Sequence, residues 1–434
     1  MSLYASMTTA ISGLTAQSRA LGNVADNVAN SQTLGFKRTD TNFVSYVTNS
    51  TLRMNLPGSV QARPDYTHSV QGQIQQAENP LAMAIAGDGF FAVAAQRGTV
   101  EGQPVFDENP LYTRAGDFRM DRNGYLVNGQ GYTLQGWGAN ATGEPDRARL
   151  TPMRVDQAVF NPIATGRLTL AANLPLDAPA ATTHTALVQV YDGLGRLNPV
   201  NLDWTRVGAN RWQVSINAPG DVNGAARGTV EVVFGDAATP PVADGTVGGF
   251  ASPSPGITTS PATVGGPATV SFSADFGAGP QPITLDLGTF GGTTGLTQYR
   301  GDNLAVRNIS QDGVPLGSFA GVGMSENGDV SINYDNGRTR LIGRIPIVGF
   351  SDPDKLQRMD GQAFQQTIES GNARVGDPAS VGLGAIVTNS VEGSNVDIAS
   401  EFSKLILAQR AYTANTKIVT VTDELLAETV NMRR

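Results

Sequence analysis

The sequence has no cysteine among its 434 residues. Disulfide bonds, thiolate metal sites and cysteine nucleophiles are therefore excluded. Charged residues are also scarce, at 16 %, and the net charge is −8 with the lysines and arginines scattered along the chain. A nucleic-acid-binding protein shows a basic patch or stripe, and an anionic membrane surface attracts clustered basic residues. The composition therefore argues against both nucleic acid and membrane as partners.

Long apolar runs are missing as well. No stretch of about 20 apolar residues could form a transmembrane helix. The first residues, Met-Ser-Leu-Tyr-Ala-Ser, lack the basic start and unbroken apolar core of a secretory signal peptide. If the protein leaves the cell, we expect a route that does not cleave such a signal.

Residues with catalytic or metal-binding chemistry are few. The two histidines, His68 and His184, have no second histidine or carboxylate at metal-ligand spacing, and we expect each to be solvated or to cap a turn. No phosphate-binding loop or catalytic-serine motif is present. If carboxylates such as Asp117, Asp121 and Glu326 were paired in space, they would fit a two-carboxylate glycosidase. Their glycine-rich context instead favours turn hydrogen bonding. The sequence thus predicts no enzyme activity, no cofactor and no metal.

The first 30 residues carry a helical stripe. Its members are separated by four and three residues in near alternation, as at the a and d positions of a coiled-coil seam: Leu3, Met7, Ile11, Leu14, Ser18, Leu21, Ala25 and Val28. Gly13 and Gly22 each lower helix propensity by about 1 kcal/mol relative to alanine. Packing against a partner must therefore supply the stability of this helix, and Gly35 is the expected stop signal.

The other end of the chain carries a similar stripe. It begins after an N-cap signal, Ser394-Asn395-Val396-Asp397. Its apolar members are Ile398, Phe402, Leu405, Ala408, Tyr412, Val419, Leu426 and Val430, with Asn415 and Thr422 at the two remaining seam positions. Two such seams predict an antiparallel helix pair or a bundle with neighbouring copies. The alternative is that each helix packs on a β-domain of its own chain.

Between the helices the sequence is rich in glycine and in β-forming residues. Short apolar runs alternate with turn signals, and Asn123-Gly124, Asn327-Gly328 and Asn336-Gly337 are typical hairpin turns. Gly235–Gly266 is close to low complexity and is expected to be a loop. We therefore predict a mixed, mainly β fold. It consists of a terminal helical coiled-coil domain (1–35 and 394–434), connecting segments (36–71 and 375–393), a split β-domain (72–144 and 296–374) and an inserted β-domain (145–295).

Several motifs resemble the rod and hook family of bacterial flagellar axial proteins. They cover both ends and both halves of the chain, about half of its length: Ser12-Gly13-Leu14, Asn23–Ser31, Thr33-Leu34-Gly35-Phe36-Lys37, Ala86–Phe91, Tyr112–Phe118, Gly124–Asn128, Leu134–Trp137, Ser394–Asp397, Glu401-Phe402 and Gln409–Asn415. Asp26 departs from the Asn-Asn pair common in the family, on a polar helix face. The inserted domain falls where hook proteins carry an outer domain.

This resemblance implies a structural subunit that polymerises into the flagellar hook. Terminal helices of many copies would line a tube, with the split domain as the middle layer and the inserted domain outside. The resemblance also implies unfolded export through the flagellar type III apparatus. The implied partners are further copies, rod proteins, hook–filament junction proteins, a hook cap and the export apparatus. A distal rod component and a secreted β-rich adhesin or carbohydrate-binding protein are the alternatives.

Overall fold

A computed structural model describes residues 3–51, 54–140 and 142–432, and the side chains of these except residues 3, 48–51 and 54–57. The chain divides into two compact units. Unit 1 comprises Met1–Gln157, Gly321–Asn333 and Thr339–Arg434, and unit 2 comprises Ala158–Ala320 and Tyr334–Arg338. The sequence placed the inserted domain at 145–295. The compact unit begins later, at Ala158, and its first segment ends later, at Ala320. The later end arises because β22 (Thr297–Tyr299) and β23 (Ala305–Gln311) both pair with a strand of unit 2.

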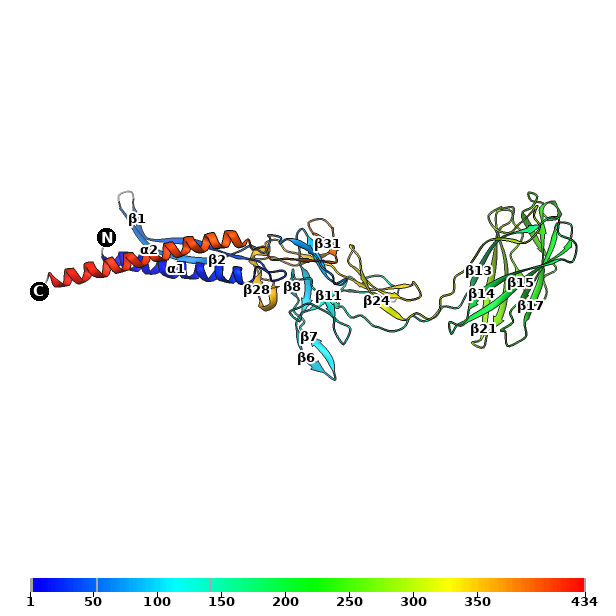
Figure 1. Ribbon diagram of the computed structural model, residues 1–434, viewed down its shortest axis with the longest axis horizontal. Coiled ribbons are helices and arrows are strands. Elements are labelled where there is room, and N and C mark those ends of the chain that lie inside the picture. Colours follow the sequence, from blue (N-terminus) through cyan, green and yellow to red (C-terminus); the bar gives the residue numbers. More distant parts are fainter. Residues whose placement is uncertain (1–2, 52–53, 141, 433–434) are drawn as a thin grey trace. The chain divides into compact units, whose positions relative to one another are not determined.

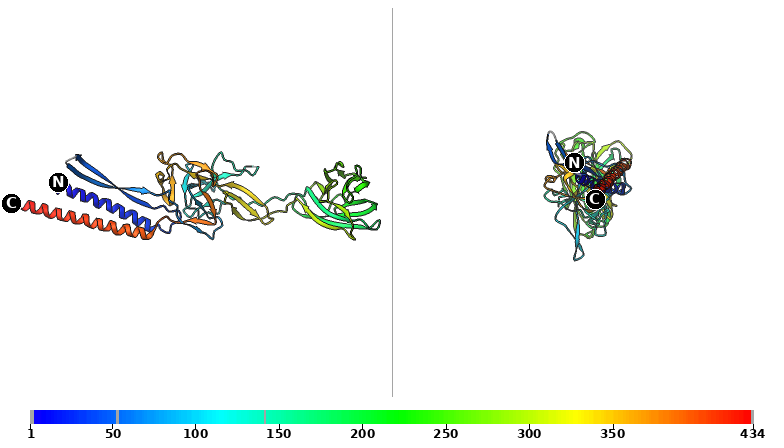
Figure 2. Two further views of the ribbon diagram at one scale, coloured as in Figure 1. Left: turned by 90° about the horizontal axis from the view of Figure 1, so that it is seen from above. Right: turned by 90° about the vertical axis from the view of Figure 1, so that its left-hand side faces the viewer.

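The two ends of the chain form an antiparallel helix pair in unit 1. Helix α1 spans Leu3–Ala29 and α2 spans Ile398–Asn431, and they lie side by side in both views of the ribbon (Figures 1 and 2). The Asp397 carboxylate caps α2 by accepting hydrogen bonds from the backbone N–H groups of Ala399 and Ser400. The last turns of α2 extend past the start of α1. The sequence prediction of two helices that pack together is confirmed.

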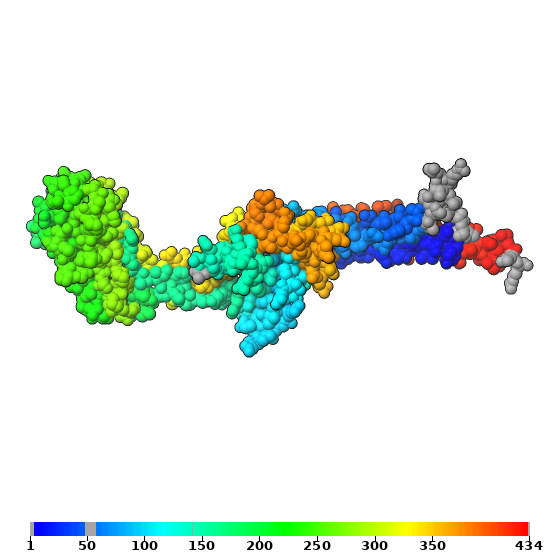
Figure 3. All heavy atoms as spheres, turned by 180° about the vertical axis from the view of Figure 1, so that it is seen from behind, coloured from blue at the N-terminus to red at the C-terminus, as the bar shows by residue number. Residues whose placement is uncertain are grey.

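A long β-hairpin follows α1 where the sequence suggested a connecting segment. It consists of β1 (Thr39–Thr51) and β2 (Met54–Tyr66), and it runs along α1 in the space-filling view (Figure 3). The Thr9 hydroxyl donates to the Gly58 carbonyl at 2.8 Å, and the Val60 N–H donates to the Ser12 hydroxyl at 3.2 Å. α1 therefore packs both on α2 and on β-structure of its own chain.

The rest of unit 1 is a set of β-sheets. The largest runs in the order β24 (Phe319–Met324), β25 (Asp329–Tyr334), β26 (Thr339–Arg344), β11 (Thr133–Gly138), β5 (Phe91–Ala94), β8 (Leu111–Thr113), β29 (Ala363–Gln365) and β28 (Gln357–Arg358), with β12 (Thr151–Pro152) and β10 (Leu126–Val127) on β11 and β9 (Arg119–Met120) on β10. Short ladders join β3 (Ile74–Gln76) to β32 (Ser390–Glu392), β4 (Met83–Ala86) to β31 (Ala385–Thr388), β27 (Ile347–Gly349) to β30 (Arg374–Gly376), and β6 (Gln96–Val100) to β7 (Gln103–Phe106). Two 3₁₀ turns, η2 (Pro353–Lys355) and η3 (Asp360–Gln362), complete it.

The Asn-Gly turns predicted from the sequence are confirmed. Gly124 lies between β9 and β10, Gly328 between β24 and β25, and Gly337 between β25 and β26. Their φ angles of 85°, 82° and 75° are left-handed. Glycine adopts this region without the steric penalty of a Cβ atom.

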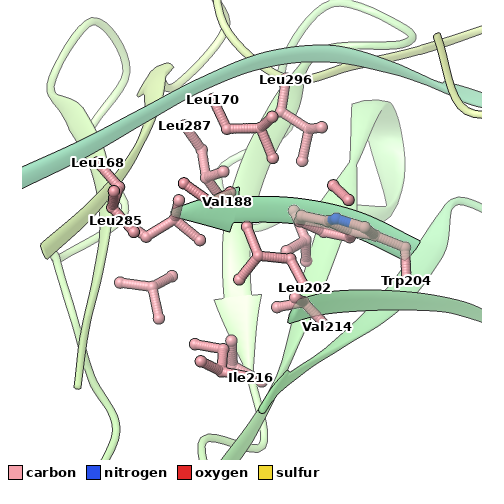
Figure 4. Close-up of a cluster of buried hydrophobic side chains, with 14 of the residues drawn as sticks. Leu168, Leu170, Val188, Leu202, Trp204, Val214, Ile216, Leu285, Leu287 and Leu296 are labelled. Carbon is pink, nitrogen blue, oxygen red and sulfur yellow. The ribbon is translucent and has the colours of Figure 1, made fainter. Parts of the chain in front are cut away.

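Unit 2 consists of two sheets packed around one core. One sheet has the order β14 (Thr183–Tyr191), β15 (Leu197–Gly208), β16 (Arg211–Asn217), β17 (Ala226–Phe234) and β18 (Val247–Ala251); the other has β19 (Thr258–Thr259), β20 (Pro267–Asp275), β21 (Pro280–Thr289), β13 (Arg167–Pro175) and β22, with β23 also on β13. Alternate side chains of β16 are buried, which is the period of a strand with one face in the core. Leu170 and Leu285 from one sheet meet Val188, Leu202 and Trp204 from the other (Figure 4).

The prediction that Gly235–Gly266 is a loop is wrong for part of this segment and agrees with the turns and irregular backbone of the rest. This segment contains the 3₁₀ turn η1 (Gly235–Ala237) and the strands β18 and β19. Gly248 in β18 is required by packing, because an added Cβ atom would lie 2.2 Å from the Cβ of Ala238. Gly248, one of the glycines that suggested a loop, therefore serves close contact within ordered structure.

Candidate assembly interface

Helix α1 buries a line of small residues within its own chain. The line comprises Ala10, Gly13, Ala16, Ala20, Val24 and Asn27. Residues three and four apart share one helix face, and small side chains let α1 approach its neighbours closely. A Cβ atom added to Gly13 would lie 2.9 Å from Nδ2 of Asn415 on α2.

Asn27 is the polar centre of this packing. Its Nδ2 donates to Oε2 of Glu401 on α2 at 3.0 Å and to the Thr39 carbonyl on β1, also at 3.0 Å, while its Oδ1 accepts from the Thr39 N–H at 2.9 Å. Lys404 reaches Glu401 at 2.7 Å and Asp40 of β1 at 2.5 Å. One buried amide therefore ties α1, α2 and the hairpin together.

The α1 seam predicted from the sequence lies on a different face from this buried line, about 100° around the helix at 3.6 residues per turn. Met7, Leu14, Leu21 and Val28 are half-buried, whereas Ile11 and Ala25 are exposed. The side chain of Leu3 lies outside the described residues. The structure thus leaves most of this stripe at least partly uncovered by its own chain.

The predicted seam of α2 is partly buried within the chain and partly exposed. Leu405, Ala408, Val419 and Leu426 are buried or half-buried, as are the polar seam residues Asn415 and Thr422. In contrast, Ile398, Phe402, Tyr412 and Val430 are exposed, and Phe402 keeps 52 % of its surface open. Large exposed apolar side chains in one region mark an interaction surface.

A buried charge cluster joins the helix pair to the sheets of unit 1. Glu392 on β32 accepts from Nζ of Lys37 at 2.5 Å and from Nη1 of Arg114 at 3.0 Å, and all three side chains are at most 1 % exposed. Its Oε1 also accepts from the Gly72 N–H at 2.7 Å, and its carbonyl accepts from the Gly35 N–H at 2.8 Å. Burial lowers the pKa of Lys37 to about 8, against the opposing effect of Glu392.

Sequence reasoning missed Glu392 but included its two cationic partners. Lys37 ends the Thr33–Lys37 motif, and Arg114 lies in the Tyr112–Phe118 motif. A basic residue in each of two motifs within a charge-poor chain was a signal for a shared acidic partner. Nothing in the sequence distinguishes Glu392 from the other glutamates.

We expected His68 to be solvated or to cap a turn, and the solvated role is wrong because the side chain is buried. It is 1 % exposed, its ring stacks on Tyr66 at 5.1 Å between ring centroids, and it contacts the Phe364 ring at 4.5 Å. Its Nδ1 lies 3.1 Å from the Pro353 carbonyl. Burial lowers the pKa of His68 to about 4. His184 is half-buried on β14.

A groove of about 610 Å³ separates α2 from the hairpin. It is lined by residues of α1, β1 and α2, including Ala20, Asn23, Phe43, Leu407 and Ala411. Among residues 3–51, 54–140 and 142–432, no cluster of three or more acidic or histidine side chains could hold a metal ion. Within the same ranges, no helix combines the length and hydropathy of a membrane span.

Comparison with known families agrees with this architecture. Residues 7–37 match the family described as Flagella basal body rod protein, and residues 387–432 match Flagellar basal body rod FlgEFG protein C-terminal. Residues 84–224 match the Flagellar hook protein FlgE/F/G D1 domain, and residues 163–314 match the Flagellar basal body protein FlaE D2 domain. The fold and these matches define a flagellar axial protein, which is a structural class of protein.

Full-length relatives narrow the class further. The flagellar hook protein FlgE of Brucella abortus is 34 % identical over 439 residues, and that of Rhizobium meliloti is 35 % identical over 444; each match covers 100 % of both chains. The Escherichia coli flagellar hook protein FlgE is 26 % identical over 98 % of this chain and 99 % of its own. This chain belongs to the flagellar hook protein FlgE family. A hook protein is thereby favoured over the distal rod and adhesin alternatives.

Proposed function

We propose that this chain polymerises with copies of itself through its helix pair, and that the polymer is a tubular hook that transmits torque from rod to filament. The observation that carries the proposal is the apolar surface that α1 and α2 leave open after they have packed together. Covering a large apolar side chain contributes about 1.5–3 kcal/mol. Exposed side chains such as Phe402 and Ile11 therefore favour association.

The interface of the proposed polymer includes the two predicted seams. On α1 these are Leu3, Met7, Ile11, Leu14, Leu21, Ala25 and Val28, and on α2 they are Ile398, Phe402, Leu405, Tyr412, Val419, Leu426 and Val430. We place the helical ends, 1–35 and 394–434, in the inner layer of the tube. The β-sheets of unit 1 form the middle layer, and unit 2 forms the outer one.

The proposed partners are those of a hook that grows by export. Rod proteins adjoin it at one end and hook–filament junction proteins at the other, while a hook cap acts during growth. The chain passes the flagellar export apparatus unfolded and without cleavage of a signal peptide. Two features support this route: a cysteine-free chain unfolds without reduction of any disulfide, and the glycine-containing α1 depends on packing for its stability.

A charge in the seam tests the proposal. Leu405→Asp introduces a carboxylate at a half-buried seam position of α2, and Thr413→Asp places the same group at an exposed position of the same helix. We expect sedimentation and electron microscopy to show curved tubes for the unmodified chain and for Thr413→Asp, but monomers for Leu405→Asp. Normal assembly of Leu405→Asp would contradict the seam assignment.

Polymer shape and truncation separate the alternative functions. A straight, stiff polymer would favour a distal rod component. Ligand binding by a monomer that survives removal of both terminal helices would favour an adhesin or carbohydrate-binding protein.

A further inference from the structure

Helix α2 carries a second line of apolar side chains, distinct from the seam predicted from the sequence. Its members are separated alternately by four and three residues: Leu407, Ala411, Ala414, Ile418, Val421 and Leu425. We call this line the second stripe. Leu407 keeps 66 % of its surface exposed and Val421 53 %. The spacing is that of a coiled-coil seam, so the second stripe fits another helix of the same period better than it fits an irregular surface.

The second stripe and the α1 seam face different sides of the helix pair. Leu407 and Ala411 line the groove beside the hairpin, together with Phe43 of β1. The α1 seam lies nearly opposite the side of α1 that bonds to the hairpin through Ser12 and Asn23, since about 100° of rotation separates successive helical residues. One molecule therefore cannot bring its own α1 seam onto its own second stripe.

The outward side of α1 carries few charges. Between Leu3 and Ala29 the charged residues are Arg19 and Asp26, whereas charged residues normally make up about a quarter to a third of a solvated surface. The α1 seam from Met7 to Val28 spans about 30 Å at 1.5 Å per residue, and the second stripe is of similar length. The two open surfaces thus match in period, extent and polarity.

We propose that the α1 seam of one copy docks on the second stripe of another copy. This inference rests on the proposed function, and it specifies which surfaces meet. Because the two surfaces differ, the contact is heterologous: each copy that docks presents a free second stripe or a free α1 seam to the next. Such contacts propagate without saturating when the rotation does not close a ring. When two neighbouring copies have the same orientation, α1 of one copy runs antiparallel to α2 of the other.

Cysteine cross-linking tests the proposal directly, because the natural chain has no cysteine. Ile11→Cys is mixed separately with Leu407→Cys, Ile418→Cys or Leu425→Cys, so that every α1–α2 cross-link joins two molecules. The three α2 positions sample the whole stripe, whatever the register. Thr413→Cys, an exposed position on another face of α2, is the matched control. Each mixture is polymerised and treated with a short bismaleimide, and peptide mass spectrometry identifies the linked residues.

We expect at least one second-stripe position to give about tenfold more linkage to residue 11 than residue 413 does, since such linkage requires close approach of the two side chains. This excess should disappear in the unpolymerised mixture. Polymers in which residue 413 links as well as all three stripe positions would overturn the inference while leaving the proposed function intact. Failure of the unmodified chain to polymerise at all, seen by sedimentation before any cross-linking, would overturn both.

Discussion

The side-chain amide of Asn27 donates to the carboxylate of Glu401 at 3.0 Å, which joins α1 to α2 across 374 positions of sequence. Both side chains are 1 % exposed. A buried polar group is costly unless it is hydrogen-bonded, so this pair favours one register of the two helices over shifted ones. The backbone of β1 takes up the remaining bonds of the Asn27 amide.

Truncation of Glu401 should loosen the helix pair. Glu401→Ala removes the acceptor of Asn27 and one partner of Lys404, which should lower the free energy of unfolding by about 1–3 kcal/mol. Glu424→Ala removes an exposed carboxylate from the same helix and should change stability little. Urea unfolding followed by far-UV circular dichroism measures both, because α1 and α2 are the α-helices of the described chain. Equal midpoints for the two variants would refute a stabilising role for the pair.

The two glycines of α1 should respond differently to alanine. Gly22 faces open space and Gly13 faces Asn415. Gly22→Ala should stabilise the helix by about 1 kcal/mol through propensity. Gly13→Ala brings the same gain in helix propensity, but the new methyl group forces Asn415 to move. Because overpacking costs about 1–3 kcal/mol, the net effect should be a loss of stability. Thermal unfolding of the two variants should therefore shift in opposite directions, and a shared upward shift would show that α1 and α2 are less closely packed than described.

Acidification should destabilise unit 1 through His68. Burial lowers its pKa in the folded chain to about 4 from 6.5. The unfolded chain therefore binds more protons between pH 6.5 and 4, and stability falls as pH falls through that window. The loss attributable to His68 should be on the order of 3 kcal/mol. Because carboxylates also titrate, the measurement is the difference in pH dependence between the natural chain and His68→Asn, determined by urea unfolding. Parallel curves would contradict the assignment.

Neutralising Glu392 should open the junction between the helices and the sheets. Glu392→Gln keeps the shape but leaves Lys37 and Arg114 buried without a counter-charge, which typically costs about 3–5 kcal/mol. Hydrogen exchange at Gly35 and Gly72, whose N–H groups donate to Glu392, should rise. The exposed Glu326→Gln is the matched control.

The same junction gives a dependence on alkaline pH. In the natural chain the pKa of Lys37 is about 8 when folded, against a reference value of 10.5. The unfolded chain therefore binds more protons between these values, so the contribution of Lys37 to stability increases as pH rises through the window. Lys37→Met should remove this contribution. An unchanged pH profile would show that Lys37 is not the titrating group.

Regular patterns made much of the fold predictable. Heptad spacing identified both helices, and Asn-Gly pairs identified three turns, because each signal depends on neighbouring residues alone. Long-range contacts were not accessible in this way. In the hairpin of residues 39–66 the turn signals Asn49-Ser50 and Pro57-Gly58 lie within the strands. Glu392 becomes distinctive only when Lys37 and Arg114 approach it from distant segments.

The hydrophobic periodicity of α1 also did not reveal which face of the helix packs within the chain. The apolar stripe containing Met7 and Leu14 is more hydrophobic than the line through Ala10 and Gly13, yet the chain buries the latter more fully. Close contact between helices selects small side chains, whereas hydropathy ranks large ones first. Hydrophobic periodicity therefore located a helix surface without showing which neighbour covers it.

The antiparallel pairing of α1 with α2 has a consequence for biosynthesis. A ribosome completes α1 early and α2 among the last segments of the chain, so a nascent polypeptide has no second helix with which to pair. Chains still being translated therefore carry an α1 seam but no second stripe, so two incomplete chains cannot form the proposed contact with each other.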